Sequence, residues 1–264
     1  MSAFERKLQG NALIITEIGK RLSFRDFLAL LSVTRTIRTN AFPYAFKVMQ
    51  WWMVMTDENA LQIPKWVPRI ETFTADFKFP PALEKLRFHF NFNRPIMCAD
   101  LPPTLTSLTF ACCFNQPIVC SDLPRTLKSL TFGWEFNQPI VCADLPRTLT
   151  SLTFGTIFNQ PIVCADLPPT LTSLTFGYWF NQPIVCADLP RTLTSLTFNG
   201  YFNRQIVCAD LPRKLTSLTF GGYFNQPIVC ADLPPALKTM TIHESHPKVD
   251  ELRARSDLKV TFYS

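Results

Sequence analysis

Cysteine is the residue type in this chain that most readily suggests metal binding or disulfide chemistry, and it occurs nine times. Seven of the cysteines recur every 22 residues, and none has the C-x-x-C spacing typical of zinc sites. Stacked copies would lie close together, but seven is an odd number and parallel side chains aim poorly for a disulfide. We interpret these seven as small buried apolar side chains and predict no metal site. They are Cys98, Cys120, Cys142, Cys164, Cys186, Cys208 and Cys230.

Two other groups of potential ligands stand beside this column. Cys112 and Cys113 are adjacent and could be reactive if exposed, although one vicinal pair is weak evidence of a site. An aspartate follows each cysteine of the column by two residues and precedes a Leu-Pro pair. Calcium binding is one alternative for these carboxylates, but a second column of oxygen ligands is missing. We expect each aspartate to accept backbone hydrogen bonds at the Leu-Pro turn.

Catalytic constellations find little support in the sequence. Only three histidines occur, His89, His243 and His246, and the last two lie near the carboxyl end. No Ser–His–acid or Cys–His arrangement can be assembled from them, and no Gly-rich phosphate loop is present. We predict that the chain is not an enzyme and that it uses no cofactor.

The formal charge of +6 does not form a nucleic-acid-binding stripe. Residues 1–91 hold 13 Lys/Arg against 8 Asp/Glu, whereas residues 92–242 hold 9 against 8. The larger part of the chain is therefore nearly neutral, and we predict no binding to nucleic acid. The apolar runs are far shorter than a bilayer span, and the amino end lacks the pattern of a signal peptide. These features predict a soluble cytoplasmic protein that does not bind membranes.

A unit of 22 residues organises most of the chain. Phe-Asn recurs at 92, 114, 136, 158, 180, 202 and 224, and a fixed period of this length is typical of a solenoid. Within a unit, "TLTSLTF" places Leu108 and Phe110 on one face and Ser107 and Thr109 on the other, which predicts a strand. "PIVC" can form a second short strand, and the Pro-bearing "ADLPRT" leaves too little chain for a helical turn. The unit therefore predicts a parallel β-solenoid, with two degenerate units ahead of it at "PRIETFTADF" and "PPALEKLRFHF".

The repeated motif "FNQPI…LPRTLTSLTFG" resembles the FNIP repeat, a relative of the leucine-rich repeat found in social amoebae and in large DNA viruses of amoebae. The resemblance covers residues 92–242 and departs from the pattern in the sixth unit, which reads "FNRQI". It implies a leucine-rich-repeat-like solenoid. Stacking of identical units also places each Asn on its counterpart, so we expect a buried Asn column that bonds the backbone of the next coil.

Residues 1–60 follow a helical rather than a strand pattern. Apolar residues recur at three- and four-residue spacings in two segments, Ser23 can cap the second segment, and a third helix is predicted over Phe42–Met55. The stretch "SFRDFLALLSVTRTIR" resembles the core of an F-box, although Thr34 stands where that family often has Cys. The resemblance implies docking to the Skp-family adaptor of a cullin–RING ubiquitin ligase. The residues expected at that contact are Leu13, Ile14, Ile18, Leu22, Phe24, Phe27, Leu28 and Leu31.

The repeats differ mainly at the two positions before each Phe-Asn. These pairs include Trp134-Glu135 and Tyr178-Trp179, and Trp and Tyr are typical of protein-interface hot spots. Arginines recur on the turn at the other end of the strand. The alternative is that the aromatic residues only shield the edge of the coils. The candidate target-binding residues are Trp134, Glu135, Tyr178, Trp179, Tyr201, Tyr223, Arg147 and Arg191.

The sequence as a whole predicts an α+β chain in four parts. They are a helical F-box-like module at 1–60, degenerate repeats at 61–91, a repeat solenoid at 92–242 and a cap at 243–264. The predicted function is that of a substrate-recognition adaptor of an SCF-type ubiquitin ligase, in the host cytoplasm if the chain is viral. One alternative is a stand-alone interaction scaffold with a helical cap. Others are a lattice-binding Ser/Thr face and self-association through an uncapped end.

Overall fold

The structure, a computed structural model, describes residues 53–55, 69–72 and 79–263 of the 264-residue chain. The predicted F-box helices and the eight residues from Leu13 to Leu31 assigned to ligase-adaptor docking lie outside the described residues. The amino-terminal part of the α+β prediction thus stays a prediction. Among the described residues, no helix is long and apolar enough to cross a bilayer.

A single parallel sheet runs the length of the described chain. Its strands follow one another in sequence order from β1 to β11, and each pairs in parallel with the next. Equivalent residues pair with each other, for example Leu108 with Leu130, so every coil stacks on its neighbour in register. The predicted parallel solenoid is therefore confirmed. The strands are β1 (Met53–Met55), β2 (Arg69–Thr72), β3 (Lys85–Phe88), β4 (Ser107–Thr109), β5 (Ser129–Thr131), β6 (Ser151–Thr153), β7 (Ser173–Phe176), β8 (Ser195–Phe198), β9 (Ser217–Thr219), β10 (Thr239–His243) and β11 (Lys259–Tyr263).

The other side of each full coil carries a short 3₁₀ helix, which corrects two predictions. The "PIVC" segment is not a strand, and the segment before Leu-Pro does hold a helical turn. In the second full coil the amide of Asp122 donates to the carbonyl of Val119 at 3.2 Å, and such an i→i+3 bond needs only three residues. Leu123, which precedes a proline, returns to extended backbone and ends the turn. The helices are η2 (Cys98–Asp100), η3 (Cys120–Asp122), η4 (Cys142–Asp144), η5 (Cys164–Asp166), η6 (Cys186–Asp188), η7 (Cys208–Asp210) and η8 (Cys230–Asp232).

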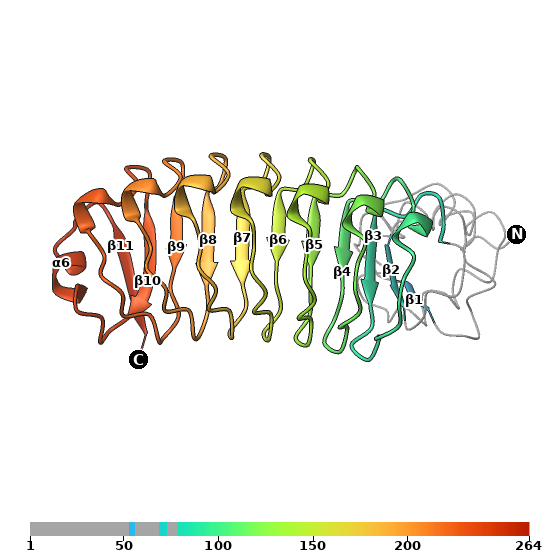
Figure 1. Cartoon of the computed structure of the whole chain (residues 1–264), viewed down its shortest axis with the longest axis horizontal. Coiled ribbons are helices and arrows are strands. Elements are labelled where there is room, and N and C mark those ends of the chain that lie inside the picture. Colours follow the sequence, from blue (N-terminus) through green and yellow to red (C-terminus); the bar gives the residue numbers. More distant parts are fainter. Residues whose placement is uncertain (1–52, 56–68, 73–78, 264) are drawn as a thin grey trace, which may run out of the picture.

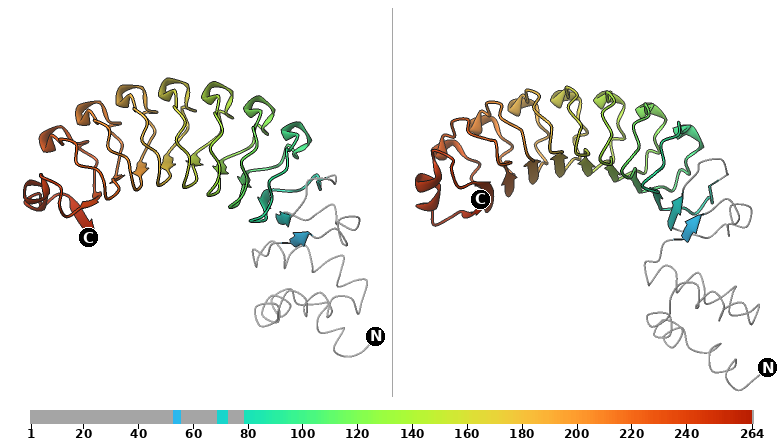
Figure 2. Two further views of the ribbon diagram at one scale, coloured as in Figure 1. Left: turned by 60° about the horizontal axis from the view of Figure 1, so that its bottom comes forward. Right: turned by 90° about the horizontal axis from the view of Figure 1, so that it is seen from below.

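The coils form an arc with two unlike faces. Figure 1 shows the strands side by side along the solenoid, with the 3₁₀ helices in front of them. In Figure 2 the strands line the inner, concave side of the arc and the 3₁₀ helices its outer, convex side. Ser107 and Thr109 of β4 are half-buried on the open face of the sheet, while Leu108 is fully buried. The concave side is therefore a surface of short hydroxyl side chains.

The first strands of the sheet refine the predicted boundaries. β2 and β3 lie in the two degenerate units, so both units belong to the solenoid. β1 covers Met53–Met55 and pairs with β2. The helix predicted over Phe42–Met55 is thus wrong at its end, and the segment assigned to the helical module contributes a strand to the solenoid. Short apolar runs fit either element, and here sheet pairing decides.

Two ladders of phenylalanine fill the interior. One ring comes from the end of each strand and the other from the Phe-Asn pair, and both are buried. Within a coil the two rings stack closely, as for Phe154 and Phe158 with centroids 4.0 Å apart. Between coils the centroids of Phe136 and Phe158 are 6.1 Å apart at 7°. Near-parallel stacking in register explains why the same ring recurs in each unit, since a smaller side chain would leave a void.

The seven repeated cysteines form a third interior ladder, as predicted, and all are buried free thiols. Burial raises the pKa of Cys142 to about 12 and that of Cys164 to about 11. Desolvation disfavours the thiolate, which is the form that reacts and binds metals. These thiols therefore act as small apolar side chains.

An amide ladder connects the coils beside the phenylalanines. The amide nitrogen of Asn137 donates to the Oδ1 of Asn115 at 2.9 Å, and the side chain of Gln138 donates to the carbonyl of Asn115 at 3.1 Å. The predicted Asn column thus exists and accepts from the next coil. It is half-exposed or exposed rather than buried, and its donors are the backbone amide of the next Asn and, in most coils, a glutamine side chain.

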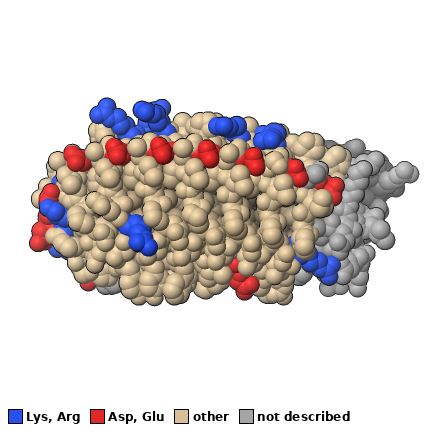
Figure 3. Space-filling view, in the orientation of Figure 1, with Lys and Arg blue, Asp and Glu red and all other residues tan. Residues whose placement is uncertain are grey.

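The aspartates do not behave as predicted. Every member of the column that starts at Asp100 is exposed, and no hydrogen bond from the backbone to these carboxylates occurs in the described residues. Asp122 accepts from the neighbouring Ser121 hydroxyl at 3.3 Å. Figure 3 shows acidic side chains in a row along the convex face. Threonines connect the coils at this turn instead, since the Thr126 hydroxyl donates to the Leu105 carbonyl at 2.8 Å.

The carboxyl end closes the interior. His246 is buried and stacks on Phe224 with ring centroids 5.8 Å apart, so it takes the place of the next phenylalanine. The helix α6 (Val249–Arg253) follows and leads into β11. The segment predicted as a cap thus carries one more strand of the same sheet.

Candidate functional site

The positions that vary between coils lie in the loops that follow the strands. Each pair stands between the two buried rings of its coil, and its backbone joins the neighbouring loop: the amide of Trp179 donates to the carbonyl of Thr156 at 2.8 Å. The residue before each pair is held even more tightly. A Cβ on Gly155 would lie 1.5 Å from the carbonyl oxygen of Gly133. Close backbone packing therefore fixes these loops and leaves the variable side chains to project from them.

Four aromatic side chains gather on these loops at the carboxyl half of the solenoid. Trp179 stacks on Tyr201 with centroids 4.5 Å apart, and Tyr201 stacks on Tyr223 at 4.2 Å. Tyr178 meets Tyr201 edge to face at 5.2 Å. Hydrogen bonding with Tyr223 raises the pKa of Tyr201. We call these residues the aromatic cluster, and it remains accessible, since Trp179 is 48% and Tyr223 52% exposed.

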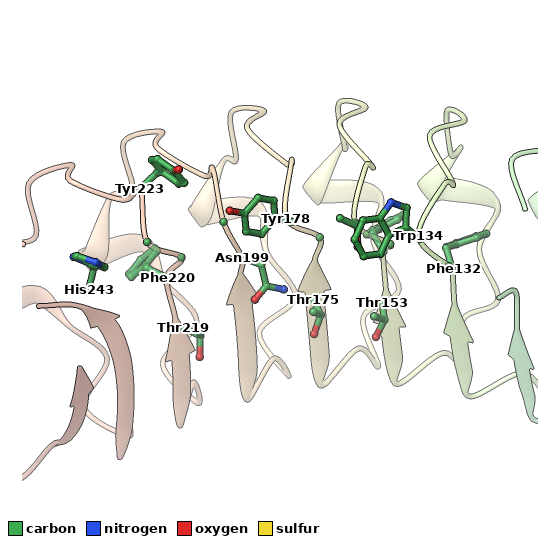
Figure 4. Close-up of a pocket in the computed structure, with 18 residues that line it drawn as sticks. Phe132, Trp134, Thr153, Thr175, Tyr178, Asn199, Thr219, Phe220, Tyr223 and His243 are labelled. Atoms are coloured by element: carbon green, nitrogen blue, oxygen red, sulfur yellow. The ribbon is translucent and has the colours of Figure 1, made fainter. Parts of the chain in front are cut away.

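An open groove of about 850 Å³ follows the strand ends beside this cluster. Its lining combines aromatic rings from the variable loops with glycine backbone and with hydroxyl and amide groups from the ends of the strands. Among the described residues, no Asp, Glu, Lys or Arg lines it. Figure 4 shows rings along the loops and polar side chains on the strands; those that line the groove include Trp134, Tyr178, Tyr223, Thr153, Thr175, Thr219 and Asn199.

The structure brings together only part of the predicted target-binding set. Tyr178, Trp179, Tyr201 and Tyr223 form the aromatic cluster, and Trp134, which is 57% exposed, lines the groove two coils before it. Glu135 lies near two cysteines rather than in the groove.

The predicted arginines lie elsewhere. Arg147 and Arg191 are exposed on the turns that enter the strands, whereas the groove follows the loops that leave them. Figure 3 shows basic side chains along the edge of the solenoid above the acidic row. The expectation that aromatic and basic residues occupy opposite ends of the strands is confirmed, so they do not form one site.

Sequence reasoning did not assign the residues at the floor of the groove to target binding, and it considered their threonine column only as part of a lattice-binding Ser/Thr face. Thr153, Thr175 and Thr219 belong to a uniform column that was interpreted as the solvent face of the sheet. Asn199 replaces the glycine of the neighbouring coils, and its side chain donates to the carbonyl of Phe176 at 2.8 Å. Gly200, the next residue, has φ of +40°. The missing glycine at 199 is the signal that could have marked this coil as different.

Comparison with known proteins agrees with this architecture. The family model described as "FNIP Repeat" matches residues 114–157, 158–201, 180–223 and 202–245, which together span half of the chain. No curated protein matches the sequence.

Two solved structures are similar to the fold. "The crystal structure of CroV588 a novel circular LRR protein structure" is 38% identical with a TM-score of 0.69, over 76% of this chain and 31% of that one. The chain therefore spans about a third of that protein's length. The leucine-rich repeat-containing protein LegL7 from Legionella pneumophila is 14% identical with a TM-score of 0.43, over 80% of this chain and 89% of that one.

The repeat model and the CroV588 structure place the solenoid among the leucine-rich-repeat-like folds, which are typically non-enzymatic scaffolds for protein–protein interaction. The residues that the repeat model matches form coils that stack in register and share the phenylalanine ladders and the amide ladder. The chain belongs to the FNIP repeat family.

Proposed function

We propose that the solenoid recognises a protein partner through the aromatic cluster and the neighbouring groove. The observation that carries the proposal is the continuous stack of accessible rings from Trp179 through Tyr201 to Tyr223. Rigid aromatic side chains give a large contact area at low entropic cost, and they are enriched in interface hot spots.

The chemistry of the groove favours a segment of polypeptide that is neither strongly acidic nor strongly basic. Its lining has no charged carboxylate, ammonium or guanidinium group, while threonine hydroxyls and Asn199 offer hydrogen bonds. An extended segment with apolar or aromatic side chains fits such a surface, because its rings can stack on the cluster while its backbone meets the hydroxyls. The alternative is that these rings only shield the edge of the coils. It does not explain why about half of Trp179 stays exposed.

A lattice-binding role finds less support. Recognition of a regular lattice needs a flat array of hydroxyl groups. Figure 2 shows instead that the sheet follows the inner side of an arc, so the Ser/Thr columns of successive strands do not share one plane.

The test compares two faces of the same molecule. Partners captured by the wild-type protein are identified by quantitative mass spectrometry, and a purified candidate is then titrated against variants. Trp179→Ala combined with Tyr223→Ala should weaken binding at least about tenfold, because truncation of hot-spot residues costs 1.4 kcal/mol or more. The matched control is Asp166→Asn combined with Asp188→Asn on the convex face, which should bind like the wild type.

Two results would contradict the proposal. One is a partner whose affinity is the same for the aromatic double variant and the wild type. The other is a partner lost only when the convex aspartates are changed.

A finer part of the proposal concerns residues 1–60. Their resemblance to an F-box supports a role as substrate-recognition adaptor, in which this segment binds the Skp-family adaptor of a cullin–RING ligase and the solenoid holds the target. The chain would then act by proximity, since it raises the concentration of the target at the ligase. This role places the protein in the cytoplasm.

The adaptor role is tested with point variants rather than with truncation, because β1 at Met53–Met55 is part of the sheet. Full-length protein should retain purified Skp-family adaptor, and Leu28→Glu or Leu31→Glu should abolish retention without changing the melting temperature. Trp134→Ala serves as the matched control and should retain the adaptor. Failure of the folded wild type to bind would leave a stand-alone interaction scaffold.

A further inference from the structure

Three groups that can bind metals meet on the first loops of the variable edge. The ligating atoms of Cys112, Cys113 and Glu135 all lie within 4.8 Å of one another. The two thiols come from one coil and the carboxylate from the next, so the third group is 22 residues away in sequence. Spacing alone therefore gave no sign of a cluster, and the vicinal pair looked isolated.

The backbone holds the two loops in place. The amide of Cys113 donates to the carbonyl of Phe90, and the amide of Glu135 donates to the carbonyl of Cys112, each at 2.8 Å. The second of these bonds joins the two loops of the cluster directly. A tetrahedral zinc ion with Zn–S bonds of about 2.3 Å holds its ligand atoms roughly 3.5–4 Å apart. A bound cation would therefore have to draw the three ligand atoms closer by rotation of their side chains.

These two thiols differ from the seven in the interior. Cys112 and Cys113 are only partly buried, while the seven ladder cysteines are buried in the interior. A metal ion binds the thiolate and needs a path to it. Of the cysteines, all of which are among the described residues, only this pair offers accessible sulfur beside a carboxylate.

We propose that Cys112, Cys113 and Glu135 bind a thiophilic divalent cation of the zinc class. Two thiolates and one carboxylate are three ligands of the kind that zinc prefers, and the exposed side of the cluster leaves the fourth position for water or for a group of a partner. The site would lock the first two variable loops together. It lies outside the aromatic cluster, which belongs to later coils.

In the absence of a cation, the surroundings of Cys113 favour its protonated thiol. Partial burial, the Glu135 carboxylate and the Cys112 thiol together raise the pKa of Cys113. A divalent cation reverses the repulsion among the three groups and displaces the thiol protons. Binding should therefore release protons, and affinity for zinc should rise with pH in the neutral range.

Two measurements on the full-length protein test the site. Cobalt(II) is titrated as a spectroscopic stand-in for zinc, and a thiolate-to-cobalt charge-transfer band with tetrahedral d–d bands is expected at one equivalent. Separately, the folded protein is treated with a thiol reagent. Two cysteines should react quickly, and one equivalent of zinc should protect both.

The variants Cys112→Ser, Cys113→Ser and Glu135→Gln should each weaken zinc binding at least about tenfold, since loss of even an outer-shell partner has that cost. The matched controls are Asp144→Asn, an exposed acid on the convex face, and Cys142→Ala in the buried ladder. Both should bind zinc like the wild type, provided that their melting curves show a folded protein.

The proposal is overturned if cobalt gives no charge-transfer band and zinc does not protect the two thiols. It is also overturned if the double cysteine variant binds zinc as well as the wild type. Binding that needs both cysteines but is unchanged in Glu135→Gln would refute the three-ligand site proposed here.

Discussion

At the position of Phe158, seven successive coils carry the same residue, and all seven rings are buried. One residue earlier, the coils from Cys113 to Tyr223 carry Cys, Glu, Ile, Trp, Tyr and Tyr. The two columns are neighbours in sequence and belong to the same loop. They differ in what surrounds the side chain, because one points into a stack of identical rings and the other lies half-buried or exposed at the edge of the coils.

This difference shows which positions the fold requires to stay the same and which can change without loss of the fold. In the interior each ring touches its counterparts above and below, so a change in one coil disturbs two others. At the variable edge the loops are tied by their backbone, as in the bond from the Trp179 amide to the Thr156 carbonyl. The side chains there can vary without loss of register, which makes this edge the place where one coil can acquire a property that the others lack.

The largest effect is expected where the interior ladder is broken. Phe158→Ala removes a ring that stacks on Phe154 at 4.0 Å and lies between Phe136 and Phe180. Truncation of a buried phenylalanine costs about 3–5 kcal/mol of unfolding free energy. Urea unfolding monitored by circular dichroism should show this loss, and it should split the transition if the array separates into two halves. A loss below about 1 kcal/mol would mean that the ladder is loosely packed.

A smaller loss of unfolding free energy is expected at the glycine column, where the backbones of neighbouring loops are in contact. Gly155→Ala places a Cβ against the carbonyl of Gly133, and a rigid backbone group cannot rotate away. We expect a loss of about 1–3 kcal/mol in unfolding free energy, the usual cost of overpacking. The matched control is Gly222→Ala in the neighbouring, half-exposed column, which should change stability by less than about 0.5 kcal/mol. Equal losses of unfolding free energy for the two variants would contradict the claim that the Gly155 column is tightly packed.

The cysteine ladder predicts a loss of stability at alkaline pH. Burial raises the pKa of Cys142 from its usual 9.0 to about 12, so the unfolded chain releases this proton near pH 9 and the folded chain does not. Stability from this thiol is therefore complete below pH 9 and falls as the pH rises toward 12. Between about pH 8 and pH 10, the unfolding free energy of Cys142→Ala should therefore fall by about 1.4 kcal/mol less than that of the wild type. Parallel pH curves for the two proteins would show that the thiol ionises freely in the fold.

The columns of equivalent residues were predicted well, because coils that stack in register place residues 22 apart on top of one another. Leu108 inward and Ser107 outward, the buried Cys98 column and the in-register coils all follow from a unit of 22 residues. It failed for the Pro-bearing turn, since a 3₁₀ helix needs only three residues and the Cys120–Asp122 segment has no pattern of its own. It also failed at Met53–Met55, where pairing with β2 outweighs an apolar pattern that fits a helix.

The candidate site was predicted only in part, for a related reason. Aromatic residues at the variable positions could be recognised by type, but their contacts run between coils. The stack of Trp179 on Tyr201, and the approach of Glu135 to Cys113, each join residues 22 apart. The separation of Arg147 from the groove likewise depends on which end of the strand each turn occupies.

The smallest effect on stability is expected at Trp134, which precedes Glu135 of the variable column and belongs to the same loop. It is 57% exposed and makes no ring stack with another residue in the described part of the chain. Trp134→Ala should change the unfolding free energy by less than about 0.5 kcal/mol. Trp179→Ala should cost about 0.5–1.5 kcal/mol, because it removes a stack on Tyr201. Chemical denaturation of both variants measures the difference. A larger loss for Trp134 would mean that this ring supports the fold, and the variable edge would then be part of the structural frame rather than a surface free to bind.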